Sequence, residues 1–130
     1  MFVQSESIQS HAPERPKILI VEDEMIIAMM LEEMLDDLGC TVAGLATKPK
    51  EALAIIETEP MDAAILDVNL NGAHSFDIAA ALDARGVPFM FSTGYGSIAG
   101  MDDRYRTRPV LRKPFRQDEL QNVLNAVLAK

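Results

Sequence analysis

Asp67 is the residue of this sequence whose surroundings point most clearly to chemistry. It directly follows a short run at 63–66 that is apolar at every position, which is typical of a strand buried on both faces in a parallel sheet. Asn69, Asn71 and Gly72 follow soon after and predict a turn. We therefore expect Asp67 at the carboxyl end of a central strand, where open α/β sheets bind their ligands.

Two further acids, Glu22 and Asp23, directly follow the apolar and β-branched run at 17–21, which predicts another strand. On neighbouring strands these carboxylates would converge with that of Asp67 and would repel one another strongly. Proteins tolerate such a group when a hard cation binds it or when one acid takes a proton. Ligands that are all oxygen, in a shallow and partly hydrated site, favour Mg²⁺ (or Mn²⁺) over zinc.

A hydroxyl and an amine complete the candidate site. Thr93 follows the segment 88–92, which predicts a strand, and Lys113 follows the short run at 110–112. A carboxylate, a divalent cation, a hydroxyl and a lysine form a site for a transferring phosphoryl group, because the cation and the lysine offset its charge and the hydroxyl binds one of its oxygens. Asp67 would then be the nucleophile and would form an aspartyl phosphate.

The elements that must position these residues alternate regularly along the chain. We predict strands at 17–21, 41–45, 63–66, 88–92 and 110–112, helices at 25–38, 49–57, 75–84 and 117–128, and at most a short or frayed helix within 96–108. This alternation predicts an α/β fold with a doubly wound, five-stranded parallel sheet. Right-handed crossovers give the strand order 2-1-3-4-5, which places the first and third strands side by side at a switch point.

Composition is that of an ordinary globular domain, with 48% hydrophobic and 25% charged residues in 130. The net charge of −8 argues against a nucleic-acid or anionic-membrane partner. No signal peptide or membrane span is evident, so we expect a cytoplasmic protein with a loose tail over residues 1–15 and one domain over 16–130. We expect Cys40, the one cysteine, to be buried, and the methionines of the first helix, Met25, Met29, Met30 and Met34, to fill the core.

Each candidate residue also has an ordinary structural explanation. Glu22, Asp23 and Glu24 could cap the first helix, and Asp67 could be a turn residue. Thr93 and Lys113 could lie in surface turns. These alternatives stay open for any one residue, but they explain poorly why all of these residues stand at the ends of four predicted strands.

This pattern resembles the receiver domain of two-component response regulators over about residues 16–130. In that resemblance Glu22 and Asp23 match the acidic pair after the first strand, and Asp67 matches the phosphoacceptor. Asn69 stands two residues beyond it, where the family uses a backbone carbonyl to bind Mg²⁺. The resemblance therefore implies a flavodoxin-like fold and a metal site formed by these four residues.

Thr93 resembles the switch hydroxyl of the family, and Lys113-Pro114-Phe115 resembles its Lys-Pro motif, often with a cis peptide. The resemblance implies phosphoryl transfer to Asp67 from a sensor histidine kinase or a histidine phosphotransfer protein, followed by slow hydrolysis. Such a domain catalyses only its own phosphorylation and dephosphorylation and is otherwise not an enzyme.

The chain departs from the family pattern in three places. Val110 stands where the family has an aromatic switch residue, and the loop after Asp67 is short and lacks its proline. The run Phe91 to Tyr95 resembles the Phe-x-Thr-Gly-Tyr receivers, which occur with an alternative class of sensor kinases in alphaproteobacteria, including general-stress circuits. We hypothesise that Tyr95 partly shields the acyl phosphate from water, and that the segment 96–108 is mobile and orders on phosphorylation.

The sequence shows no output module after the last predicted helix, so we expect the phosphorylated form to bind an unknown downstream protein or to act as a phosphate sink or relay. One alternative is a pseudo-receiver, an adaptor that works without phosphorylation, and Val110 is its best support. Another is a phosphatase of the haloacid dehalogenase type, which needs a second acid where Asn69 stands.

Overall fold

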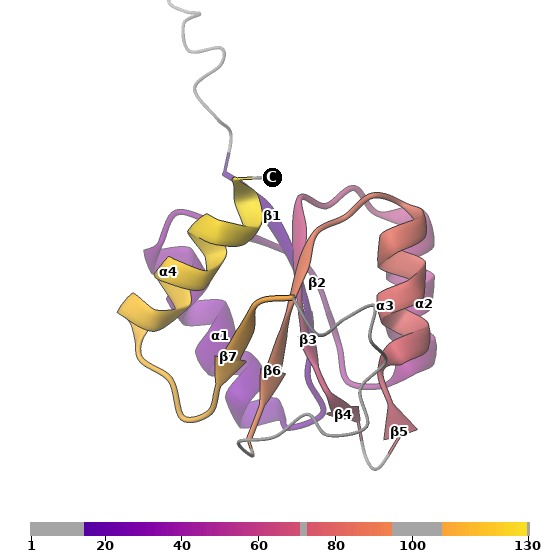
Figure 1. Cartoon of the computed structure of the whole chain (residues 1–130), viewed down its shortest axis with the longest axis horizontal. Helices are drawn as coiled ribbons and strands as arrows, with labels where there is room; N and C mark the ends of the chain where they lie inside the picture. Colours follow the sequence, from indigo (N-terminus) through magenta and orange to yellow (C-terminus); the bar gives the residue numbers. More distant parts are fainter. Residues whose placement is uncertain (1–14, 71–72, 95–107, 130) are drawn as a thin grey trace, which may run out of the picture.

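A five-stranded parallel sheet with helices on both faces forms the fold (Figure 1). The computed structural model describes residues 15–70, 73–94 and 108–129. The strands of the sheet are β1 (Lys17–Val21), β2 (Thr41–Ala46), β3 (Ala63–Asp67), β6 (Phe89–Thr93) and β7 (Val110–Arg112). The helices are α1 (Met25–Asp37), α2 (Pro49–Thr58), α3 (Phe76–Ala84) and α4 (Gln117–Leu128). The strand order is β2-β1-β3-β6-β7, so the predicted order 2-1-3-4-5 is confirmed.

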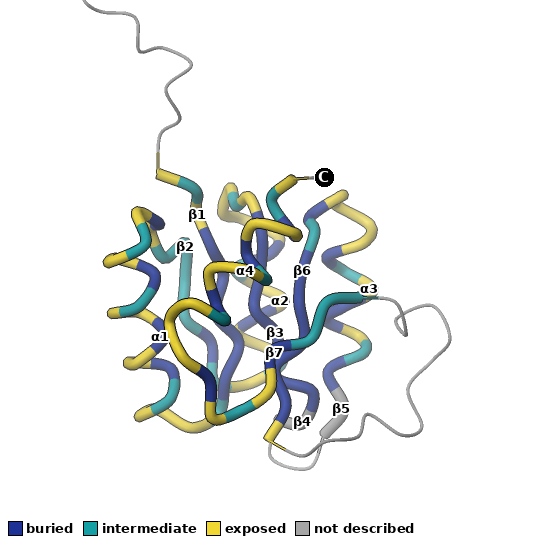
Figure 2. The backbone as a smooth tube through the Cα atoms, turned by 60° about the vertical axis from the view of Figure 1, so that its left-hand side comes forward, coloured by how far each residue is buried: buried dark blue, intermediate teal, exposed yellow. Residues whose placement is uncertain are grey.

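Alternate residues of the central strands pack against different helices. On β1, Ile18 and Ile20 pack with α1 and α4, whereas Leu19 and Val21 pack with α2 and α3. Every residue of β3 and of β6 is buried. This burial on both faces explains why these segments are continuous apolar runs in the sequence. Figure 2 shows the buried strands enclosed by helices whose outer sides are exposed.

The predicted boundaries of the strands and helices agree with the observed ones to within one residue at each end. The main consequence is that Asp67 and Thr93 are the last residues of their strands and not the first residues beyond them. Cys40 is buried, as expected, and this burial raises the pKa of its thiol more than the nearby Arg15 guanidinium lowers it. None of the described helices has the length and apolar character of a membrane span.

The turn predicted after Asp67 is partly wrong, because β4 (Asn69–Leu70) and β5 (Ala73–His74) form a small antiparallel hairpin there. Strands of two residues are too short to leave an alternating pattern in the sequence. Residues 71–72, between these strands, lie outside the described residues. The same holds for most of the N-terminal tail and for the segment 95–107, which includes Tyr95 and the expected fourth helix.

The expectation that the methionines of α1 fill the core is wrong for Met25, Met29 and Met30. These side chains are 51%, 57% and 43% exposed, and their neighbour Ile26 is 77% exposed. Met34 is partly buried against the core. The helix is apolar around most of its circumference, but the sheet covers only one stripe of it. That stripe consists of Ala28, Leu31 and Leu35.

Gly39 ends α1 with a positive φ of 86°, and an added Cβ would meet no atom within 4 Å. A change to alanine therefore acts through the backbone alone. We expect Gly39→Ala to lower the free energy of unfolding by about 1 kcal/mol, because the left-handed region is unfavourable for L-residues. Gly39→Asn should lose less, because asparagine adopts this region more easily. Urea unfolding of the three proteins checks this, and equal stability of the wild type and Gly39→Ala would contradict it.

Candidate functional site

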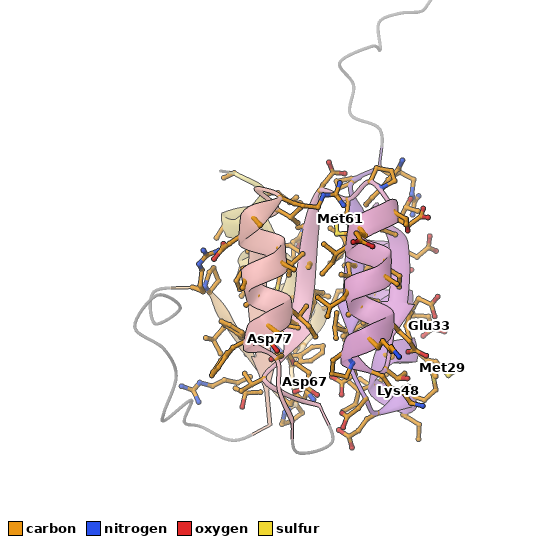
Figure 3. The ribbon with its side chains drawn as sticks, turned by 90° about the vertical axis from the view of Figure 1, so that its right-hand side faces the viewer. Met29, Glu33, Lys48, Met61, Asp67 and Asp77 are labelled. Carbon is orange, nitrogen blue, oxygen red and sulfur yellow. The ribbon has the colours of Figure 1, made fainter. Side chains whose placement is uncertain are left out.

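The three acids predicted to converge do meet at the carboxyl edge of the sheet. Glu22 and Asp23 follow β1, Asp67 ends β3, and these two strands pair in register. One carboxylate oxygen from each of the three residues lies within 4.8 Å of the others. Glu22 is 1% exposed and Asp67 is 6% exposed, so two of the three charges are almost fully removed from water. Figure 3 shows Asp67 at this end of the sheet.

Lys113 provides the positive charge that this cluster needs. Its Nζ lies 2.9 Å from Oε1 of Glu22 and 3.5 Å from Oδ2 of Asp67. The carboxylate of Glu24 is farther away, at 3.9 Å. Partial burial alone would lower the pKa of Lys113, but the hydrogen bond to Glu22 and the charges of the nearby acids outweigh it and hold that pKa above its ordinary value. Lys113 is therefore a stable cation at any ordinary pH.

The backbone brings Thr93 and Lys113 to the same edge. The carbonyl of Thr93, which is 6% exposed, accepts a hydrogen bond of 2.8 Å from the backbone N–H of Lys113. On the other side of β6, Ser92 pairs in register with Asp67, and its carbonyl accepts a hydrogen bond of 3.0 Å from the N–H of Val68. The ladder of the sheet thus continues up to the candidate residues and holds them in place.

The segment after Lys113 is anchored on both sides. The peptide bond between Lys113 and Pro114 is cis, as the family resemblance implies, and Phe115 is buried in the layer between the sheet and α1 and α4. Helix α4 then begins with the carboxylate of Glu119 accepting a hydrogen bond of 2.7 Å from the backbone N–H of Arg116. Lys113 is therefore fixed between a strand and a capped helix.

The donor set of the cluster suits a hard divalent cation. All candidate ligand atoms of Glu22, Asp23 and Asp67 are carboxylate oxygens, and Lys113 offsets only part of their charge. Asn69 lies in β4, two residues beyond Asp67, and the ligand role of its carbonyl stays a prediction.

The sequence analysis connected Val110 and Tyr95 with switching, and the structure describes only Val110. Val110 begins β7, pairs with Phe91 and packs partly buried against the layer formed with α2 and α3, so no aromatic ring stands at this position. Tyr95 lies outside the described residues.

Two residues outside the predicted site also contribute to this edge. Glu24 adds a distant carboxylate to Lys113, and Ser92 places a buried hydroxyl in register with Asp67. The sequence signal for Ser92 was a polar residue inside an otherwise apolar strand, which is uncommon without a reason.

Comparisons with known proteins agree with this geometry. The family model of the response regulator receiver domain matches residues 18–125. Transcriptional regulatory protein TcrA of Mycobacterium tuberculosis is 36% identical over 120 residues, which cover 85% of this chain and 45% of TcrA. Phyllosphere-induced regulator PhyR of Methylorubrum extorquens is 32% identical over 115 residues, which cover 86% of this chain and 43% of PhyR. The chain thus spans less than half the length of these curated relatives.

Solved structures give the same answer. The solution structure of SdrG from Sphingomonas melonis is 50% identical, with a TM-score of 0.79, and the match covers 89% of this chain and 98% of SdrG. The BeF3-activated conformation of SdrG, also 50% identical, has a TM-score of 0.75 and a match that covers 86% of this chain and 95% of that one. With the acidic edge and the strand order described above, these matches establish that this chain belongs to the response regulator receiver domain family of two-component systems.

Proposed function

We propose that this domain accepts a phosphoryl group on Asp67 from a phosphohistidine of a sensor histidine kinase or a histidine phosphotransfer protein. The phosphorylated form then signals by binding another protein, or serves as a phosphate sink or relay. One observation carries this proposal. Asp67 stands at the edge of the sheet with two further carboxylates within 4.8 Å and the Nζ of Lys113 at 3.5 Å. This arrangement favours attack by a carboxylate on an anionic group.

The chain's own residues divide the chemistry between them. A carboxylate oxygen of Asp67 attacks phosphorus, the phosphorus–nitrogen bond of the donor breaks, and its electron pair returns to the imidazole. Lys113 offsets the charge of the phosphoryl oxygens, while Glu22 holds the ammonium in position at 2.9 Å. The hydroxyl of Thr93 donates to one phosphoryl oxygen.

A divalent cation completes this site. Glu22, Asp23, Asp67 and the backbone carbonyl of Asn69 would hold Mg²⁺ (or Mn²⁺), which when bound offsets negative charge on the acids and on the phosphoryl group. A phosphorylation-independent adaptor would need neither this cluster nor its lysine, so the assembled pocket does not favour that alternative.

The first prediction of the proposed function concerns the phosphoacceptor. Incubation with acetyl phosphate and Mg²⁺ should add one phosphoryl group to the wild type, and Asp67→Ala should add none, because the nucleophile is missing. Asp77→Ala is a matched control, since Asp77 is an exposed acid at the start of α3 (Figure 3). Intact mass spectrometry in the presence and absence of EDTA reads the result. An adduct that persists in Asp67→Ala would refute this assignment.

The second prediction concerns the metal. Mg²⁺ should raise the melting temperature of the wild type, because it binds the folded cluster and not the unfolded chain. Asp23→Asn should weaken the apparent affinity by about tenfold or more, through loss of one ligand charge. Asp37→Asn, an exposed acid at the other end of α1, should behave as the wild type. An equal response of Asp23→Asn and the wild type to Mg²⁺ would remove Asp23 from the site.

The exposed apolar side of α1 is the docking surface that we assign to the phosphodonor protein. We define this α1 face by Met25, Ile26, Met29 and Met30, four exposed side chains on consecutive turns. It borders the acidic edge, because α1 begins directly after Glu24, whose carboxylate is 3.9 Å from the Nζ of Lys113. Glu32, Glu33 and Asp36 line the same surface groove as Ile26, Met29 and Met30. Figure 3 shows Met29 and Glu33 on the outside of the molecule.

An exposed apolar patch with an acidic rim fits a partner that has an apolar helix face and basic residues around it. We expect Ile26→Glu to slow phosphotransfer from a histidine kinase that phosphorylates the wild type by about tenfold or more, because it buries a charge in that interface. The rate with acetyl phosphate should not change, since the small donor needs no docking surface.

Leu53→Glu is the control for this third experiment, because Leu53 is an apolar side chain of α2 that is 38% exposed outside the α1 face. Equal loss with the kinase in both variants, or a parallel loss with acetyl phosphate, would count against the assigned surface.

A further inference from the structure

Two buried serines lie near the candidate phosphoacceptor, Ser75 along the chain and Ser92 on the neighbouring strand, and they differ in whether the hydroxyl has a hydrogen-bond partner. Ser75, at 0% exposure, donates a hydrogen bond of 2.9 Å from its hydroxyl to the carbonyl of Val68. Ser92, at 1% exposure, has no hydrogen-bond partner for its hydroxyl in the described part of the structure. A buried hydroxyl without a partner has lost its water and gained nothing in return, so it destabilises the fold.

The strand geometry places this hydroxyl on the same face of the sheet as the phosphoacceptor. Ile65 on β3 and Met90 on β6 both pack in the layer with α1 and α4. Two residues farther along their strands come Asp67 and Ser92, which therefore face the same layer. The two are also directly paired in the register between β3 and β6.

Ser92 also pairs in register with Leu111 of β7, which lies in the α1 and α4 layer two residues before Lys113. The hydroxyl of Ser92 thus lies between the strands that carry Asp67 and Lys113. Adjacent strands are about 4.8 Å apart, so Ser92 and Asp67 are direct neighbours across the sheet.

We propose that the Ser92 hydroxyl is a hydrogen-bond donor reserved for the phosphorylated state, in which it binds a carboxyl oxygen of Asp67. This inference rests on the function proposed above. In the present structure Lys113 lies between Glu22, at 2.9 Å, and Asp67, at 3.5 Å. Phosphorylation moves the negative charge of Asp67 outward onto the phosphoryl oxygens, and Lys113 follows that charge. The Asp67 oxygen that is not bonded to phosphorus then accepts a hydrogen bond from the uncharged hydroxyl of Ser92.

This hydrogen bond has a consequence for the lifetime of the phosphoryl group. In hydrolysis, a water oxygen bonds to phosphorus, the bond from phosphorus to the Asp67 oxygen breaks, and its electron pair returns to the carboxylate. The water proton leaves with the phosphate or to solvent. A donor to the carboxyl group stabilises the negative charge that returns to it, so Ser92 should speed dephosphorylation.

The test compares Ser92→Ala, Ser75→Ala and the wild type in two states, with Mg²⁺ alone and with Mg²⁺ plus beryllofluoride as the phosphoryl mimic. With Mg²⁺ alone, Ser92→Ala should melt at the same temperature as the wild type or a few degrees higher, because it removes an unsatisfied hydroxyl. Ser75→Ala should melt lower in both states, because its hydroxyl has a partner. Beryllofluoride should bind Ser92→Ala about three- to tenfold more weakly than the wild type.

Two further measurements sharpen the comparison. The phosphoryl group formed with acetyl phosphate should be lost more slowly from Ser92→Ala, by about the same factor. Ser92→Thr, which keeps the hydroxyl, should restore the affinity for beryllofluoride.

The proposal is overturned if Ser92→Ala binds beryllofluoride as well as the wild type does, or if it lowers the melting temperature without beryllofluoride as much as Ser75→Ala. A wild type that neither binds beryllofluoride nor forms an adduct overturns the proposed function as well. A wild type that does both, beside an unchanged Ser92→Ala, overturns the role of Ser92 alone.

Discussion

The ion pair between Lys113 and Glu22 is the interaction on which the acidic edge depends. Glu22 is 1% exposed, and its carboxylate has the Lys113 ammonium 2.9 Å away. A carboxylate removed from water without such a partner would cost several kcal/mol, and the nearby acids would add repulsion. The strand ends can therefore hold their acids close together only because β7 delivers a cation to the same edge. The rest of the fold positions these residues, since the order of the parallel strands determines which strand ends lie side by side.

The two layers that flank the sheet differ in the residues that they contain. The layer with α2 and α3 contains the edge-to-face pair of Phe89 and Phe91, whose ring centroids are 5.4 Å apart. The layer with α1 and α4 ends at the acidic residues and includes Phe115, directly after the lysine motif. The exposed α1 face lies on this second side as well. Reactive groups and the surface assigned to the donor thus share one side of the molecule, which shortens the distance over which a partner must be positioned.

Much of this could be predicted from the sequence, because a parallel sheet leaves a strong signal. Strands buried on both faces appear as short apolar runs, and the run of β3 ends abruptly at Asp67. Right-handed crossovers then leave few possible strand orders. The exposed methionines could not be predicted in this way, since a helix that is apolar around most of its circumference does not reveal which stripe the sheet covers. The lack of a hydrogen-bond partner for the Ser92 hydroxyl could not be predicted either, because it depends on atomic packing and not on the pattern of residue types. The hairpin of β4 and β5 is too short to leave any pattern.

The separation of Lys113 from Glu22 also has a consequence for how the protein is made. The two residues stand 91 positions apart, and the other four strands of the sheet, β1, β2, β3 and β6, are synthesised before β7. A nascent chain that has completed β3 already contains all the acids of the edge but none of the counter-charge. The acids then repel one another, which disfavours early closure of that edge. Arrival of β7 brings Lys113 to the edge and offsets part of this repulsion. A chain that lacks β7 therefore lacks the cation that pairs with Glu22 at the acidic edge.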